Sequence, residues 1–272
     1  MVAKTKISWM HDLRIYIQAL RLQIRSNMSL RGAFAIQLVG VALYNSAQIV
    51  AWLFLFHQFG TINGWAGREL IGLMGINMLV FGVVMFLSIG ITDLPRHVDY
   101  GSFDNLLVKP SPLILQLASG KLDATNAGDA MLGLGITVWY MATTPLSFLQ
   151  VLLFLLALVV SAVIFWCFAL LLPSILAFYV FDSERISARL GMLILDSSSY
   201  PTGVLTDVLR AALLTILPGL LIGAVPLQLL NRFEWQAVLF GVVVAIFWLA
   251  FSLWFFHRSL RRYESSNLIG TR

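Results

Sequence analysis

Residues 149–179 read LQVLLFLLALVVSAVIFWCFALLLPSILAFY, a run of 31 residues without one charged side chain. An α-helix needs about 20 apolar residues to cross a bilayer, because each residue advances the helix by about 1.5 Å. The run is longer than a bilayer requires, and Pro173 near its end is expected to kink or break the helix. The stretch therefore predicts a membrane-spanning helix.

Further apolar runs predict four more spans, over residues 33–56, 70–91, 127–144 and 235–256. These runs are continuous, whereas the strands of a membrane barrel would alternate in polarity. Only 11% of the 272 residues are charged, compared with about 25% in soluble proteins. The sequence therefore predicts an all-α integral membrane protein whose single transmembrane domain covers residues 33–257.

The region between residues 184 and 227 offers two candidates for one further crossing. Residues 184–200 are amphipathic and short, whereas residues 204–227 are apolar enough to span but contain Asp207, Arg210 and two prolines. We expect one segment to cross and the other to lie flat or to re-enter the membrane. Either choice predicts six transmembrane helices.

Basic residues divide unequally between the two sets of loops. Fifteen Lys and Arg residues fall in residues 1–31, 92–122, 181–191 and 258–272, and two fall in the opposite loops. Cytoplasmic loops carry such an excess of Lys and Arg, so both termini, including the basic tail of residues 258–272, are predicted to be cytoplasmic. The net charge of +5 is explained by the membrane surface rather than by a nucleic acid.

The N-terminal segment, residues 1–32, is predicted to form a cytoplasmic amphipathic helix. Leu13, Ile17, Leu20 and Ile24 share one stripe at helical spacing, and arginines flank it. Such a helix suits the membrane surface, with its arginines at the headgroups. Packing against the cytoplasmic side of the protein itself is an equal alternative.

Residues 101–110, GSFDNLLVKP, stand out in the predicted cytoplasmic loop of residues 92–122. Phe103, Leu106 and Leu107 follow i, i+3, i+4, which gives a short helix one apolar side. Pro110 ends any such helix. That side suits either the groove of a soluble partner or the membrane surface, and the spacing alone does not decide between them.

Polar side chains inside spans are costly unless they face a partner or a cavity. Gln37, Asn45 and Gln48 of the first span lie within about 80° of arc, so they are predicted to line a translocation path or a subunit interface. Hydrogen bonding between helices is the alternative. Asp123, Asn126 and Asp129 near the start of the third span are expected to cap the helix, although Asp129 is also a candidate proton or cation site.

No group of residues predicts catalysis. The four histidines lie on different loops, so no metal site is predicted, and the single cysteine makes no intramolecular disulfide. Ser119-Gly120-Lys121 is a fragment of a phosphate-binding loop, but leucine stands at positions 115 and 122, where that loop needs Gly and Ser or Thr. The chain is therefore predicted to be no enzyme and to bind no cofactor itself.

The run Gly101-x-Phe103-Asp104-x-Leu106-Leu107-x-Lys109-Pro110 resembles the cytoplasmic loop of the ABC type-2 exporter permease family. A bacterial subgroup of similar length has further landmarks, which here read, in order, Tyr200-Pro201, Leu209-Arg210, Leu217-Pro218 and Pro226. The chain departs from the subgroup at Leu205, where a phenylalanine is usual, and at Phe178-Tyr179, where relatives have Phe-Trp.

This resemblance implies a six-span half-permease of an exporter in the bacterial cytoplasmic membrane. It implies a second permease, homologous or identical, and two copies of an ATPase subunit that binds ATP and Mg. The coupling element on the ATPase would comprise Gly101, Phe103, Asp104, Leu106, Leu107, Lys109 and Pro110. Residues 184–200 would form the fifth span, and Tyr200, Pro201 and Pro218 would lie in an outer re-entrant region.

The predicted function is therefore export of a hydrophobic or amphipathic compound (drug-like, lipid or glycan-linked), driven by ATP hydrolysis in the partner. One alternative is a proton-coupled secondary transporter that uses Asp129; an inverted repeat would favour it, and the two halves of the sequence are not similar. The other is a membrane scaffold subunit. Only the exporter should copurify with an ATPase.

Overall fold

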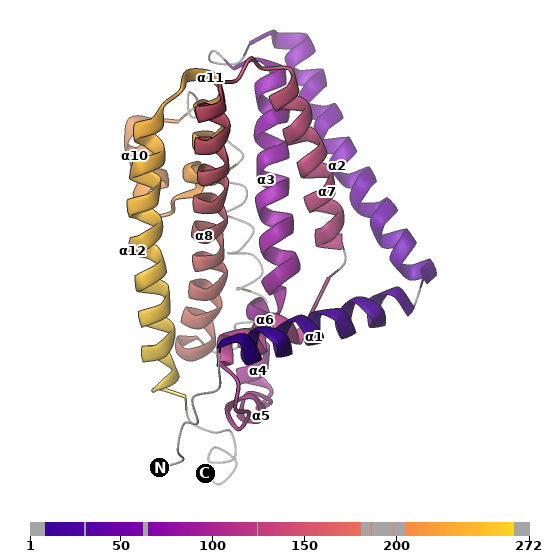
Figure 1. Ribbon diagram of the computed structural model, residues 1–272, viewed down its shortest axis with the longest axis vertical. Helices are drawn as coiled ribbons and strands as arrows, with labels where there is room; N and C mark the ends of the chain where they lie inside the picture. The colour runs from indigo at the N-terminus through magenta and orange to yellow at the C-terminus, as the bar shows by residue number, and fades with distance from the viewer. Residues whose placement is uncertain are drawn as a thin grey trace.

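The computed structural model describes residues 9–29, 31–61, 65–123, 125–180, 186, 198 and 205–263, and every regular element in them is a helix. Five long helices stand side by side (Figure 1): α2 (Arg31–Phe59), α3 (Gly67–Ser88), α7 (Thr125–Ala142), α8 (Phe148–Tyr179) and α12 (Trp235–Leu260). The predicted all-α class is confirmed.

In the part of the chain that the structure describes, four helical stretches are long and apolar enough to cross a membrane, over residues 34–54, 67–99, 148–179 and 235–260. The fifth long helix, α7, starts in a polar segment and is not among them. Four candidate spans agree with a multi-pass membrane protein, and six crossings stay a prediction.

Short helices occupy the two ends of the bundle (Figure 1). One end carries α4 (Leu94–Asp99), α5 (Asp104–Leu107) and α6 (Leu113–Gly120), and α1 (Trp9–Ser29) lies across it. The other end carries α10 (Asp207–Thr215), the 3-10 turn η3 (Gly219–Leu221) and α11 (Ala224–Arg232). We refer to these as the α5 end and the α11 end.

Helix α7 is held against α3 by direct backbone contact. A Cβ atom added to Gly133 of α7 would lie 2.2 Å from the Leu79 nitrogen, and one added to Gly82 of α3 would lie 2.3 Å from the Ala130 nitrogen. Only glycine fits at these two positions. Small residues that allow close approach are typical of helix packing in membranes. The predicted span of residues 127–144, which corresponds to α7, is therefore held by close packing against α3.

Helices α8 and α12 are parallel neighbours. Gly241 of α12 lies against Val160 of α8. Further along the pair, the ring centroids of Trp248 and Phe168 are 4.7 Å apart. Residue numbers rise together on both helices, so both run from the α11 end to the α5 end. Pro173 does not break α8, which continues to Tyr179.

Residues 204–227 do not form one continuous helix. The described part is divided into α10, η3 and α11, with Pro218 between the first two. The nine residues of α10 or of α11 extend only about 14 Å, less than half of a bilayer core, so neither helix alone is long enough to cross. The competing segment, residues 184–200, lies outside the described residues except for Ile186 and Ser198, as do Tyr200 and Pro201.

Helix α1 packs on the α5 end of its own chain. The Tyr16 hydroxyl donates to the Leu87 carbonyl, Gln23 Nε2 donates to the Gly120 carbonyl at 3.2 Å, and Leu20 is buried. Leu13 and Ile17 of the predicted stripe remain exposed. The stripe is therefore only partly covered by the protein, and its open part suits the membrane surface.

Candidate functional site

The loop that carries residues 101–110 is built on a left-handed glycine. Gly101 ends α4 with φ 70°, a conformation that costs glycine little. Its N–H donates to the Val98 carbonyl at 3.2 Å, and the Phe103 N–H donates to the His97 carbonyl at 3.0 Å. The chain turns sharply there and starts α5 at Asp104.

Phe103 lies in the core of the protein, with none of its side chain exposed. Its ring packs edge-on against Tyr263 and Phe178, with centroids 4.8 and 5.9 Å away. The prediction that Phe103 shares an exposed apolar side with Leu106 and Leu107 is therefore wrong for Phe103. The turn at Gly101 points this ring at the ends of α8 and α12, where apolar surface of the same chain covers it.

The exposed part of the loop lies further along. Leu106 is half-buried, Leu107 is 49% exposed and Val108 is 83% exposed, and Lys109 and Pro110 are exposed as well. Figure 1 shows α5 beyond α4 at its end of the bundle. The loop thus presents a small apolar surface, which we call the α5 tip and define as Leu107, Val108 and Pro110.

Asp104 faces inward, beside Tyr263. Burial, together with the neighbouring Asp104 carboxylate, raises the pKa of Tyr263 to about 12. The phenol therefore stays neutral at physiological pH. Asp104 and Phe103 thus connect the loop to the end of the last helix, whereas the α5 tip stays open.

The three polar residues of α2 do not act together. Asn45 is buried, and its Nδ2 donates to Asp129 Oδ1 on α7 at 2.7 Å. Gln37 and Gln48 are exposed, and Gln48 Nε2 donates to the Tyr44 hydroxyl on the same helix at 2.7 Å. One member thus bonds between helices, while the other two face away from the rest of the chain.

The expectation that Asp129 caps α7 is wrong. The Asp123 carboxylate accepts the N–H of Thr125, the first residue of α7, at 3.0 Å and the Thr125 hydroxyl at 2.6 Å. Asp129 lies one turn further on and accepts the bond from Asn45 instead. The cap and the interhelical bond are therefore made by two different aspartates.

Replacing Asn45 by leucine is expected to lower the free energy of unfolding by about 1–3 kcal/mol, because it leaves the half-buried Asp129 carboxylate without its donor. Gln48→Leu is the control: it removes an exposed polar group that bonds only within α2, and it should change stability by less than about 0.5 kcal/mol. Thermal unfolding of both variants of the purified chain measures the difference. Equal effects would show that the Asn45 bond contributes nothing specific.

A polar cluster at the α11 end was not predicted from the sequence. Arg68 donates to the Thr143 carbonyl at 2.8 Å and lies over the Tyr140 ring, 5.1 Å from its centroid. The Tyr140 hydroxyl donates to Asn231 Oδ1 at 2.7 Å, and Asn231 Nδ2 donates to Glu69 at 2.9 Å. The cluster ties the start of α3 and the end of α11 to the end of α7.

A cavity of about 690 Å³ adjoins this cluster. Its walls combine apolar and charged side chains, among them Trp65, Glu69, Arg210, Arg232, Glu234 and Phe240. Sequence reasoning missed this site because its members come from four distant segments, each of which reads as an ordinary helix end.

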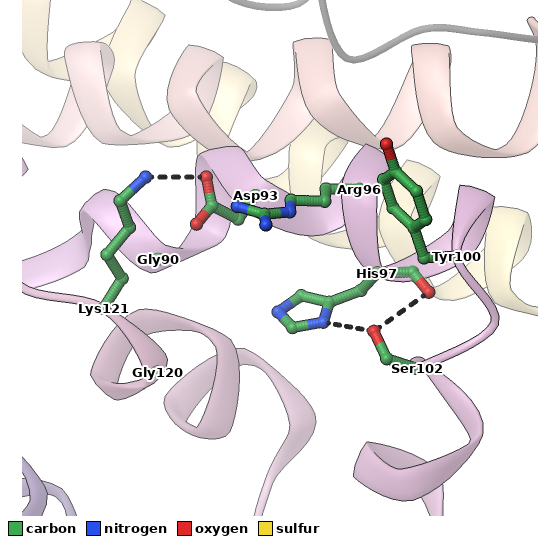
Figure 2. A pocket seen from close by; sticks show the side chains of 8 residues that line it. All are labelled: Gly90, Asp93, Arg96, His97, Tyr100, Ser102, Gly120 and Lys121. Carbon is green, nitrogen blue, oxygen red and sulfur yellow. Dashed lines mark hydrogen bonds and ion pairs between the residues drawn. The ribbon is translucent and has the colours of Figure 1, made fainter.

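A second cavity, of about 520 Å³, lies at the α5 end between the segment that follows α3, which is the 3-10 turn η1 (Ile89–Asp93) and α4, and the end of α6; we call it the α3–α6 pocket. Asp93, Arg96, His97, Tyr100, Ser102 and Lys121 line it (Figure 2). Lys121 Nζ pairs with Asp93 Oδ1 at 3.0 Å. Among the described residues no group of three or more His, Cys, Asp or Glu side chains could hold a metal ion.

The helices, their apolarity and the helical cluster at one end define a multi-pass membrane protein. The family model described as ABC-2 family transporter protein matches residues 42–267. The chain therefore belongs to the ABC-2 transporter family, and the family predicted from the loop motif is confirmed. No curated protein and no solved structure shows a significant similarity to it.

Proposed function

We propose that the chain is the membrane permease subunit of an ABC exporter and that its α5 end is cytoplasmic. The observation that carries this proposal is the α5 tip: in a member of the ABC-2 transporter family, an exposed apolar surface projects from the end of the bundle where basic residues concentrate. Such a surface suits a soluble partner.

The orientation is supported by the placement of the basic side chains. Among the described side chains, three cations lie at the α11 end (Arg68, Arg210 and Arg232), and nine lie at the α5 end. The nine are Arg14, Arg21, Arg25, Arg96, Lys109, Lys121, Arg258, Arg261 and Arg262. The end with the excess of basic residues is the cytoplasmic one by the positive-inside rule.

Six crossings are supported by the direction of α8 and α12. Because the two helices are parallel, the chain between them has to return to the α11 end, where α10 and α11 lie. We propose that residues 184–200 make this fifth crossing and that α10 to α11, with Pro218, form the outer re-entrant region.

A second permease is supported by the open face of α2. Only 6% of the most apolar part of this helix is buried within the chain. The open surface is nevertheless not purely apolar, because Gln37 and Gln48 are exposed on the same helix. Exposed polar side chains are unfavourable against lipid, so we propose that this face meets the second permease, identical or homologous.

The proposed substrate is a hydrophobic or amphipathic compound: drug-like, lipid or glycan-linked. ATP and Mg would be bound by two copies of a separate ATPase subunit, and this chain would hydrolyse no ATP. The α5 tip would transmit the conformational change of the ATPase to α3 through α4, and to the ends of α8 and α12 through the buried Phe103.

Purification of the tagged chain from its native membrane tests the proposal. We expect a P-loop ATPase to copurify and its hydrolysis to depend on the permease, with none from the isolated chain. A cysteine introduced at Lys109 should be labelled only in permeabilised cells, whereas one at Glu234 should be labelled in intact cells. Absence of an ATPase, or labelling of position 109 from outside, would contradict the proposal.

A further inference from the structure

The α3–α6 pocket has the chemistry of an anion site. Two cationic side chains, Arg96 and Lys121, line it against one carboxylate, Asp93, which leaves a net positive charge. The Lys121 ammonium has three N–H donors, and the contact with Asp93 Oδ1 at 3.0 Å occupies one of them. The carboxylate thus fixes the position of the lysine and leaves donors for a ligand.

Two further groups line the same cavity. The Ser102 hydroxyl donates to the His97 carbonyl at 3.4 Å, and its oxygen lies within hydrogen-bond distance of His97 Nδ1, at 2.8 Å. This fixes the imidazole ring, which points into the pocket (Figure 2). The positioned ring and Arg96 come from α4 and Lys121 from the end of α6, so two segments distant in the sequence bring these groups to one cavity.

The position of the pocket points to the membrane surface. It opens where the candidate span of residues 67–99 ends, beside α6, on which α1 lies through Gln23. Tyr100 at the rim is 75% exposed, and tyrosine is enriched at membrane–water interfaces. The α5 tip lies beyond α4 (Figure 1), so the pocket lies between the membrane-spanning helices and the proposed ATPase contact.

We propose that the α3–α6 pocket binds an anionic phosphate group, held by Arg96 and Lys121, from the membrane surface at the α5 end. Arg and Lys are the usual partners of phosphate oxygens, and bonds between charged groups are the strong ones. An anionic phospholipid headgroup and inorganic phosphate share this chemistry. Occupancy would bind α4 to the end of α6, independently of which compound the chain exports.

Binding of phosphatidylglycerol to the purified full chain, counted by native mass spectrometry in detergent, tests this proposal. We expect Arg96→Gln and Lys121→Gln each to weaken binding about ten-fold, as loss of one charged hydrogen bond predicts. Asp93→Asn should tighten it several-fold, because it removes a like charge from beside the phosphate, while the amide oxygen can still accept the hydrogen bond that positions Lys121. Arg14→Gln, on the exposed side of α1, is the matched control and should leave binding within about two-fold.

A second arm separates the two sources of phosphate. If inorganic phosphate displaces the lipid from the wild type more effectively than sulfate at equal ionic strength, then the free ion is also a ligand. If it does not, the ligand is the lipid headgroup. Either result supports the proposal, provided that the substitutions act as expected.

Three results would overturn it. Equal weakening by Arg96→Gln and Arg14→Gln would mean diffuse surface attraction, and weaker binding by Asp93→Asn would mean that the carboxylate only holds the fold. The third result would be that the chain binds phosphatidylglycerol no better than phosphatidylcholine and that the ATPase no longer copurifies with the Arg96→Gln variant. The pocket would then belong to the ATPase contact.

Discussion

Replacing Phe103 by alanine is expected to lower the free energy of unfolding by about 3–5 kcal/mol, the range for removal of a buried aromatic ring. The ring is fully buried and packs on Phe178 and Tyr263, so its loss leaves a cavity where the loop meets α8 and the end of α12. Thermal unfolding of the purified chain in detergent measures the loss, and limited proteolysis near residues 101–110 reports whether the loop loosens first.

Val108→Ala is the control for this measurement. It removes an apolar side chain from the same loop, but one that is 83% exposed, and it should change stability by less than about 0.5 kcal/mol. Phe103→Leu should fall between the two, because leucine fills part of the cavity. If Phe103→Ala and Val108→Ala unfold at the same temperature, the ring is not packed as described.

The long helices could be predicted from sequence because their signal is local. The predicted span over residues 149–179 differs from α8 by one residue at its start. The predicted span over residues 235–256 differs from α12 by four residues at its end. Length and apolarity are properties of the run itself, so no knowledge of neighbours is needed. The direct backbone contact at Gly133, in contrast, depends on the register between α3 and α7, which no local pattern contains.

In the loop of residues 101–110, residue spacing alone does not reveal which side chains are exposed. The i, i+3, i+4 pattern correctly groups Phe103 with Leu106, but it does not say whether that side faces the chain itself or a partner. The left-handed Gly101 and the core at Phe178 and Tyr263 decide this. The bond between Asn45 and Asp129 joins residues 84 positions apart, and each alone is an ordinary polar residue in a span.

Replacing Leu107 and Val108 together by aspartate is expected to abolish copurification of the ATPase. Each apolar anchor of a docked helix contributes about 1–3 kcal/mol, so two of them correspond to about a hundred-fold or more in affinity, and buried carboxylates add a desolvation cost. Both side chains are exposed in this chain, so insertion and thermal unfolding of the permease should not change. Copurification and permease-dependent hydrolysis in membranes are the measurements.

Val208→Asp provides a matched control, because Val208 is 82% exposed on α10 at the opposite end. It introduces one carboxylate, half of the added charge, on an equally exposed valine, and ATPase binding should stay at the wild-type level. Lys109→Ala tests a charge at the rim of the α5 tip and should cost less than about 1 kcal/mol. If the double aspartate variant retains the ATPase, the contact lies elsewhere, with α1 the next candidate, since it lies across the same end. Loss of the ATPase in Phe103→Ala but not in the double variant would mean that the loop supports the partner contact only indirectly, through the core beneath it.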